Sequence, residues 1–226
     1  MTASTSCPRC GGSLQPPGLW SSEWRCEKHG AVLPLHVAQV PSLRVLRGVT
    51  GKARVPAWMP HPLPISWVIT GIAYVGDERS GVRGFALLCS GPSPVGGPAD
   101  MALVAEEPGV GLGARLAGLT DPDPGPLSGP AEVKLSVAGH PTALWAAAAG
   151  STDRVAYAGE ARGCWLWAVL WPESASLLLL EDLRLEDLRD DVVPDAELLF
   201  GAASPRMSAL ATGPTLRGEP GAGGSD

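Results

Sequence analysis

The chain is poor in positive charge and in long apolar runs. Only three of its 226 residues are lysine, and 23 acidic residues face 17 lysines and arginines, which leaves a net charge of −6. Binding to a nucleic-acid backbone releases counterions through clustered basic side chains, so this balance argues against a large nucleic-acid-binding surface. No apolar run reaches the roughly 18 residues of a membrane span, and the N-terminus lacks the basic start and apolar segment of a secretory signal. We therefore expect a soluble, cytoplasmic protein.

A disulfide framework is also missing. The five cysteines are an odd number, and three of them cluster near the N-terminus, whereas Cys89 and Cys164 lie inside apolar stretches. This distribution is not that of a disulfide scaffold, and it indicates metal ligation by the clustered cysteines. Cys89 has no activating partner nearby in the sequence, so we interpret it as a buried structural thiol.

The composition nevertheless predicts a folded chain with many turns. The hydrophobic fraction is 45%, and eight tryptophans accompany 29 glycines and 23 prolines. We expect a zinc-ribbon-like module over residues 1–40, a linker over 41–55, a Trp-rich antiparallel domain over 56–205 and a disordered tail over 206–226. The linker should be extended rather than helical, because Pro41, Pro56 and two glycines disfavour a helix.

The fold class indicated by the main domain is α+β with a mainly antiparallel β-sheet. Short β-like runs alternate with turn residues, and they pair most simply as hairpins. The glycine-rich stretch 111–119 supplies at most a short helix, and the tandem LEDLR after residue 180 suits either a strand edge or a helical turn. In CWLWAVLW both alternate faces are apolar, so this strand should be covered on both sides. The predicted strands are residues 67–75, 84–90, 101–106, 133–138, 142–148, 154–161, 164–171 and 176–180.

Four side chains in the N-terminal segment form a metal-binding pattern. Cys7 and Cys10 lie in a CPRCGG knuckle, and Cys26 and His29 follow in CEKHG. The spacing C-x2-C-x15-C-x2-H suits a tetrahedral zinc ion with no open position, and the glycines permit the tight knuckle turn. A closed site of this kind is structural, and His36 is a substitute ligand if His29 points away. A redox pair is disfavoured because no strand precedes Cys7.

The remaining candidate sites each have a simpler structural interpretation. Gly109 to Ala114 satisfies the letters of a dinucleotide-binding loop, but no βαβ unit follows, so a structural loop is favoured. The carboxylates of Asp121 and Asp123 fall short of a calcium loop. Adjacent Glu106 and Glu107 should point to opposite faces and cannot act as a pair. His140, beside a proline, is favoured as a turn residue over a general base.

The tryptophans outside the N-terminal module are expected mainly in the core. An exposed subset could instead form an interaction surface. These tryptophans are Trp58, Trp67, Trp145, Trp165, Trp167 and Trp171.

With these motifs in place, the chain resembles an uncharacterised actinobacterial family, a domain of unknown function whose members begin with a CPxCGG knuckle. The resemblance runs over most of residues 7–205 and includes VPAWMPHPLPISWVITG, GDERSG, LVAEEPGVGLGARLAGL, DPDPGP, HPTALW, GEARGCWLWAVLWP and DLRD. Some members carry the label phosphotransacetylase. The resemblance implies no established activity. The residues do not support that label, since a short zinc-dependent phosphotransacylase would use histidine-rich ligands with an open coordination position.

Three functional hypotheses follow. The leading one is a non-catalytic, zinc-stabilised interaction or adaptor protein that binds a protein partner or a second copy of itself. The enzyme alternative is acyl or phosphoryl transfer, with His140 and the loop 106–125 lining one cleft. The third makes the zinc module a nucleic-acid-binding regulator, and Glu23 and Glu27 offset the charges on which it depends. The residues it would use are Arg9, Arg25, Lys28, Trp20 and Trp24.

Overall fold

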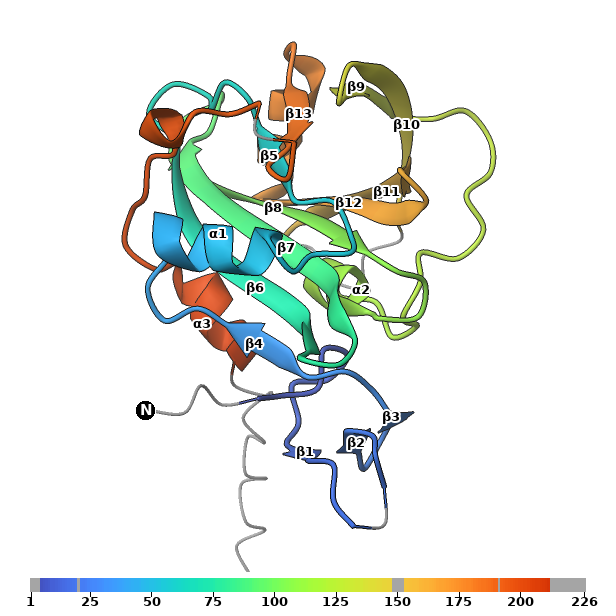
Figure 1. Ribbon diagram of the computed structural model, residues 1–226. Helices are drawn as coiled ribbons and strands as arrows, with labels where there is room; N and C mark the ends of the chain where they lie inside the picture. Colours follow the sequence, from blue (N-terminus) through green and yellow to red (C-terminus); the bar gives the residue numbers. More distant parts are fainter. Residues whose placement is uncertain (1–4, 20, 148–152, 191, 212–226) are drawn as a thin grey trace, which may run out of the picture.

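The computed structural model describes residues 5–19, 21–147, 153–190 and 192–211. A large sheet with short helices forms the body of the molecule, and a small sheet projects from one end of it (Figure 1). In the described residues no helix is long and apolar enough to cross a membrane. The small sheet consists of β1 (Leu14–Gln15), β2 (Arg25–Cys26) and β3 (Gly30–Ala31).

The large sheet has ten strands in the order β4-β6-β7-β8-β12-β11-β10-β9-β13-β5. Its neighbours pair antiparallel except β13 and β9, which run parallel. The expected α+β class with a mainly antiparallel sheet is therefore confirmed. The strands are β4 (Leu35–Val37), β5 (Trp58–Pro60), β6 (Val68–Asp77), β7 (Gly81–Pro92), β8 (Pro98–Glu106), β9 (Val133–Val137), β10 (His140–Ala146), β11 (Val155–Ala161), β12 (Cys164–Trp171) and β13 (Arg184–Asp187).

Strand β12 separates two apolar cores. Leu166, Ala168 and Leu170 face one core, to which helix α1 (Leu43–Thr50) contributes. Trp167 and Val169 face the other core, which helices α2 (Leu112–Ala117) and α3 (Pro205–Ala211) help to cover. The alternation of β12 side chains between two buried faces explains why its sequence has no polar face, as expected.

Helix α1 contradicts the prediction of an extended linker over residues 41–55. The hydroxyl of Ser42 accepts a hydrogen bond from the backbone N–H of Val45 and caps the helix. Leu46 and Val49 lie on the buried side of α1 and contact the core. Pro41 precedes the cap and so does not interrupt the helical hydrogen bonds, which is why proline was a misleading signal here.

The run SLLLL was wrongly predicted to be a strand. It belongs to the 3₁₀ helix η1 (Glu173–Leu180), in which Leu178 and Leu179 are buried while Leu180 is 71% exposed. A second short 3₁₀ helix, η2 (Asp195–Glu197), follows β13. The second LEDLR repeat supplies β13, so the strand alternative holds for that copy.

The body extends beyond both predicted boundaries of the main domain, residues 56 and 205. Strand β4 falls within the predicted module of residues 1–40 but pairs with β6 of the large sheet. Helix α3 falls mostly within the predicted tail of residues 206–226, and Met207 and Leu210 are buried against the sheet. Residues 212–226 lie outside the described part of the chain.

Replacing Leu166 with Ala should test whether β12 is buried on both faces. Leu166 is fully buried, so Leu166→Ala should lower the free energy of unfolding by about 2–5 kcal/mol through lost burial and a residual cavity. Leu180→Ala is the matched control, because Leu180 is largely exposed, and it should change stability by less than about 0.5 kcal/mol. Urea unfolding followed by tryptophan fluorescence measures both, and equal effects would contradict this packing.

Candidate metal centre

The four predicted ligands come together at the end of the small sheet. The ligand atoms of Cys7, Cys10, Cys26 and His29 all lie within 4.8 Å of one another. The Gly11 N–H donates to the Cys7 carbonyl at 2.8 Å, and Gly11 has a φ of 73°, so the first knuckle uses the left-handed conformation that glycine permits. Gly30, directly after His29, has a φ of 68°. The local sequence therefore turns both ligand pairs toward one point.

The spacing of the ligand atoms fits a tetrahedral metal ion. The Sγ atoms of Cys10 and Cys26 lie 3.7 Å apart, and Nδ1 of His29 lies 3.4 Å from Sγ of Cys7 and 3.6 Å from Sγ of Cys26. Zinc–sulfur bonds of about 2.3 Å in a tetrahedron place two thiolates about 3.8 Å apart. This cluster could therefore hold a metal ion, with His29 presenting Nδ1.

The surroundings of the cluster favour two of the protonation states that metal binding requires. Burial lowers the pKa of His29, and the charges of Arg9 and Lys28 lower it further, so the imidazole is neutral at pH 7. Burial acts to raise the pKa of Cys26, but hydrogen bonds from the backbone of His29 and Lys28 and from the other thiols bring it below its usual value. A neutral imidazole and a thiolate are the ligand forms of these side chains.

His36 is not a substitute ligand. Its Nε2 lies 3.0 Å from the carbonyl oxygen of Gly76, and its ring stacks on Tyr74 with 4.6 Å between centroids. Both contacts hold His36 on β4 against β6. His29 points into the cluster, so the condition for using His36 does not arise.

The CPRCGG knuckle contacts the glycine-rich loop of the body, which comprises residues 109–114. Arg9 donates a hydrogen bond from Nη2 to the carbonyl oxygen of Gly109. Arg115 of α2 donates to the carbonyl oxygen of Cys7 at 3.3 Å and to that of Leu210 in α3 at 3.0 Å. Ser6 and Leu35 form an isolated antiparallel β-bridge, in which two backbone hydrogen bonds connect the segment before the knuckle to β4. These contacts tie the metal cluster to two helices and to the edge of the large sheet.

Residues 1–207 match a family of unknown function, DUF6758. The chain belongs to this family. The match includes the cysteine and histidine cluster together with the large sheet. No curated protein and no solved structure matches the chain.

The glycine loop of this DUF6758 protein is a structural loop. Both carboxylate oxygens of the fully buried Glu106 accept hydrogen bonds from α2, one from the N–H of Leu112 at 2.7 Å and one from that of Gly113 at 3.0 Å. These are the N–H groups that would bind a phosphate in a dinucleotide fold. Trp167 packs against Gly113 so closely that an added Cβ would lie 2.3 Å from its Cδ1. Glu106 and Trp167 thus occupy the space a nucleotide would need.

Asp123 supports the same loop from the opposite side. Its Oδ1 accepts hydrogen bonds from the backbone N–H of Gly109 and from Nε1 of Trp165, both at 2.8 Å. Asp123 therefore has a role within the loop, as the structural interpretation of the DPDPGP segment expected. Glu107 points away from Glu106 and forms an ion pair with Arg83 at 2.5 Å, so the two adjacent glutamates do not form a catalytic pair.

The residues of the enzyme hypothesis do not converge on one cleft. His140 is exposed on the β9–β10 hairpin, whereas Glu106 is fully buried beside α2. Neither residue lines the cleft between Arg9 and Arg83 or the cleft beside His36 and Tyr74. Cys89 is 1% exposed, and burial raises the pKa of its thiol to about 12, as expected for a structural thiol. Trp58, Trp67, Trp167 and Trp171 are buried core residues.

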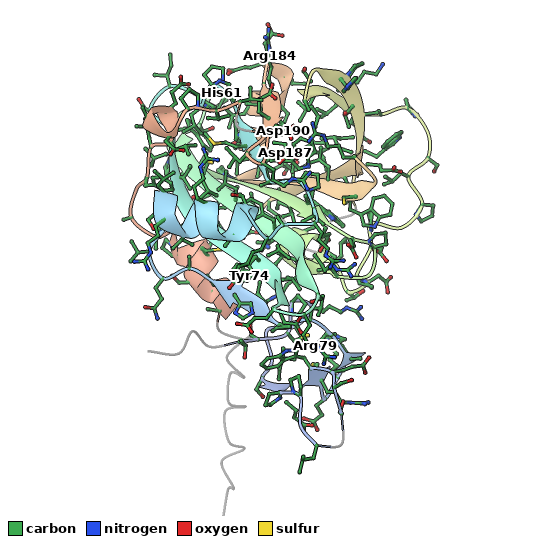
Figure 2. All side chains as sticks on the ribbon, in the orientation of Figure 1. His61, Tyr74, Arg79, Arg184, Asp187 and Asp190 are labelled. Atoms are coloured by element: carbon green, nitrogen blue, oxygen red, sulfur yellow. The ribbon has the colours of Figure 1, made fainter. Side chains whose placement is uncertain are left out.

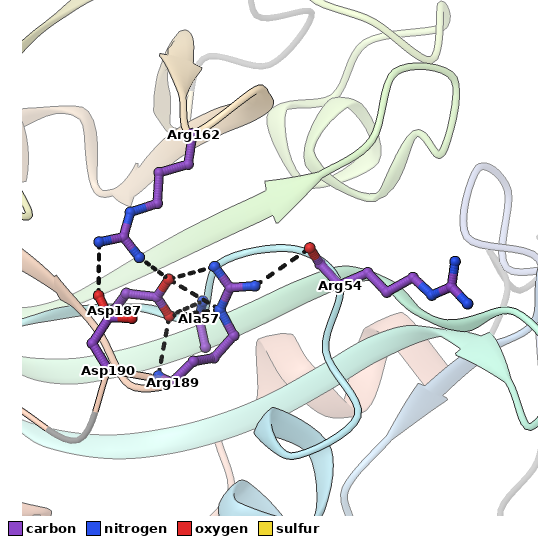
Figure 3. A network of polar contacts seen from close by, with 6 residues as sticks. All are labelled: Arg54, Ala57, Arg162, Asp187, Arg189 and Asp190. Atoms are coloured by element: carbon purple, nitrogen blue, oxygen red, sulfur yellow. Dashed lines mark hydrogen bonds and ion pairs between the residues drawn. The ribbon is translucent and has the colours of Figure 1, made fainter.

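A buried ion cluster around Asp187 was missed by sequence reasoning. Asp187 is fully buried and accepts hydrogen bonds from Arg162 at 2.8 Å, from Arg189 at 2.7 Å and from the N–H of Ala57 at 3.0 Å (Figure 3). Burial acts to raise the pKa of Asp187, but these bonds lower it overall. Arg162 also binds Asp190 at 2.7 Å. The cluster joins β5, β13 and the β11–β12 turn, and both oxygens of Asp187 are occupied by protein donors.

The buried Glu106 should make stability depend on pH. Burial raises its pKa from 4.5 to about 8, against the opposing effect of the two N–H donors. The unfolded chain releases this proton near pH 4.5 and the folded chain near pH 8, so unfolding releases a proton between these values. We expect the free energy of unfolding to fall as pH rises through this window. Urea unfolding at several pH values measures the slope.

Glu106→Gln should remove that contribution to the slope. It should also lower stability at pH 5 by about 1–3 kcal/mol, because a glutamine offers one acceptor oxygen to two N–H donors. Glu107→Gln is the matched control, since it changes the neighbouring, half-exposed carboxylate. A Glu106→Gln curve parallel to that of the wild type would show that another group titrates.

Proposed function

We propose that this protein is a non-catalytic adaptor in which a structural zinc ion holds the N-terminal module in shape for docking to a protein partner or a second copy of the chain. The main support is the geometry of the metal cluster. Its four ligand atoms, from Cys7, Cys10, Cys26 and His29, account for all positions of a tetrahedral ion, which is the pattern of a structural rather than a catalytic zinc.

The module needs the metal for its own stability. Its strands have only two residues each, and it contributes few side chains to either apolar core. A segment this short cannot bury enough surface to fold alone, so metal binding would supply much of its folding free energy. We propose residues 1–40 as one functional unit on this basis, with β4 as its attachment to the large sheet.

The tip of the module carries the feature that suggests a partner. Leu19, in the loop between β1 and β2, is 98% exposed. An isolated exposed leucine is common, but this one belongs to the β1–β2 loop of the projecting small sheet (Figure 1), and Arg9 and Arg115 link that module to the body. An apolar side chain on a rigid projection is suited to anchor an interface.

The other two hypotheses receive less support. Acyl or phosphoryl transfer would require His140 and the loop around Glu106 to share a cleft, and they lie on separate elements. Nucleic-acid binding would require Arg9 to face outward, whereas it bonds to Gly109 of the body. Trp20, a stacking residue of that hypothesis, lies outside the described residues.

The metal assignment can be tested by composition. We expect one zinc ion per purified full-length chain by inductively coupled plasma mass spectrometry, and loss of zinc in Cys26→Ser because three ligands bind far more weakly than four. Cys164→Ser is the matched control, since this thiol lies in the body and should leave the zinc content unchanged. A wild-type chain with neither zinc nor iron in stoichiometric amount would refute the metal site.

The adaptor assignment can be tested at Leu19. Leu19→Asp should reduce recovery of specifically captured proteins, or self-association, by about thirtyfold, since loss of an interface hot-spot residue costs about 2 kcal/mol or more. Quantitative affinity capture from the native host and analytical ultracentrifugation measure the two alternatives. Leu180→Asp, at an exposed leucine of the body, is the matched control. Equal recovery with both variants at unchanged zinc content would count against docking through the tip.

A further inference from the structure

A cleft of about 570 Å³ lies at the joint between the N-terminal module and the body. One wall is formed by Arg9 of the first knuckle and by Trp24 of the module. The opposite wall is formed by Arg79 and Arg83 of the β6–β7 hairpin and by Glu107. Figure 2 shows Arg79 where the hairpin meets the module. The volume falls within the range of about 300–1,000 Å³ that is typical of small-molecule sites.

The floor of this cleft is apolar. Val32 and Leu33 of the module meet Val75 of β6 and Val110 of the glycine loop there. The carbonyl oxygen of Trp24 accepts a hydrogen bond from Val32 at 3.1 Å, which fixes the backbone at the edge of the floor. An apolar floor with an indole at its edge can hold a flat apolar group.

Two of the acidic side chains in the cleft are already occupied within the protein. Glu107 forms its ion pair with Arg83. Asp77 accepts hydrogen bonds from the hydroxyl of Ser80 at 2.6 Å and from the N–H groups of Ser80 and Arg79, and these bonds lower its pKa. Glu23, the third acidic side chain, is exposed at the rim.

Among the described residues, two arginines of the cleft form no close ion pair with a carboxylate, although the charge of Arg79 helps to lower the pKa of Asp77. Arg79 makes one long hydrogen bond of 3.4 Å from Nη1 to the carbonyl oxygen of Ser22. Arg9 bonds through Nη2 to Gly109 and makes no other side-chain hydrogen bond within the described residues; its Nε is buried, so the donors open to a ligand are the terminal ones. A guanidinium has five N–H donors, and buried polar atoms are nearly always bonded, so both arginines have unused capacity.

We propose that this cleft binds a small ligand that combines an anionic group with a flat apolar part. Arg79 and Arg9 bind the carboxylate or phosphate from opposite walls, and the apolar part lies on the floor against Trp24. Guanidinium groups match carboxylate and phosphate oxygens in geometry and form charge-assisted hydrogen bonds with them. On a chain with a net charge of −6, this local pair of arginines is what makes an anion site possible.

The cleft proposal rests in part on the proposed zinc-held module, because one wall belongs to it. It does not require a protein partner. A protein without bound zinc would undermine both proposals, whereas a zinc-loaded chain that binds no anionic probe would overturn the cleft alone.

The test is a titration of the zinc-loaded full chain with matched probes, followed through the indole N–H signal of Trp24 in ¹⁵N-resolved NMR spectra. Adenosine monophosphate is compared with adenosine, and indole-3-acetate with indole-3-ethanol, so that each pair differs in its anionic group. We expect saturable shifts with at least one anionic member and about tenfold weaker binding of its neutral partner. The two pairs distinguish a phosphate from a carboxylate ligand.

Arg79→Ala should weaken binding of the anionic probe by about tenfold, because it removes one charge-assisted contact. Arg25→Ala is the matched control, since Arg25 is exposed on the same module and does not line the cleft, and it should alter affinity by less than about twofold. Arg9→Lys, which keeps the charge but loses the planar fork, should give an intermediate loss. Absence of saturable shifts with both anionic probes, or unchanged affinity in Arg79→Ala, would overturn the proposal.

Discussion

Glu106 ends β8 with its carboxyl group fully buried, and a buried polar group needs hydrogen-bond partners. The chain meets this requirement by turning at the glycine loop and presenting the N–H groups of Leu112 and Gly113 at the start of α2. This turn brings the carbonyl oxygen of Gly109 within hydrogen-bonding distance of Arg9. It also brings Arg115 of α2 to the carbonyl oxygen of Cys7. The attachment of the metal module therefore depends on how one buried acid is satisfied.

The metal cluster and this loop support each other. The cluster of Cys7, Cys10, Cys26 and His29 includes the knuckle that carries Arg9, and the loop supplies the carbonyl oxygen that Arg9 binds. Neither part alone would hold the module at a defined angle, because the module's own strands are too short to make a core. The cleft at the joint is a consequence of this arrangement, since its two walls come from segments far apart in the sequence.

Polar groups in the rest of the body are mostly satisfied within the protein. Asp187 is surrounded by Arg162, Arg189 and Ala57, and Asp123 is bonded to Gly109 and Trp165. Such closed sets of hydrogen bonds join separate segments, and at Asp187 they occupy both carboxylate oxygens. The arginines at the joint differ from them, because their donors are only partly used.

The sequence by itself determined the features that depend on near neighbours. The spacing of Cys7, Cys10, Cys26 and His29 predicted the cluster that these four side chains form, since a knuckle brings side chains together within three residues. Alternating apolar residues and turn glycines identified most strands, and the two apolar faces of β12 identified a strand buried on both sides.

Only the tertiary structure decided the rest. Helix α1 has a local cap at Ser42, but the burial of Leu46 and Val49 against the sheet, like the burial of Leu178 and Leu179 in η1, is a tertiary contact that proline and leucine runs do not encode. Asp187 and Ala57 are 130 residues apart along the chain, and Arg9 and Gly109 are 100 residues apart, so no local pattern records these contacts.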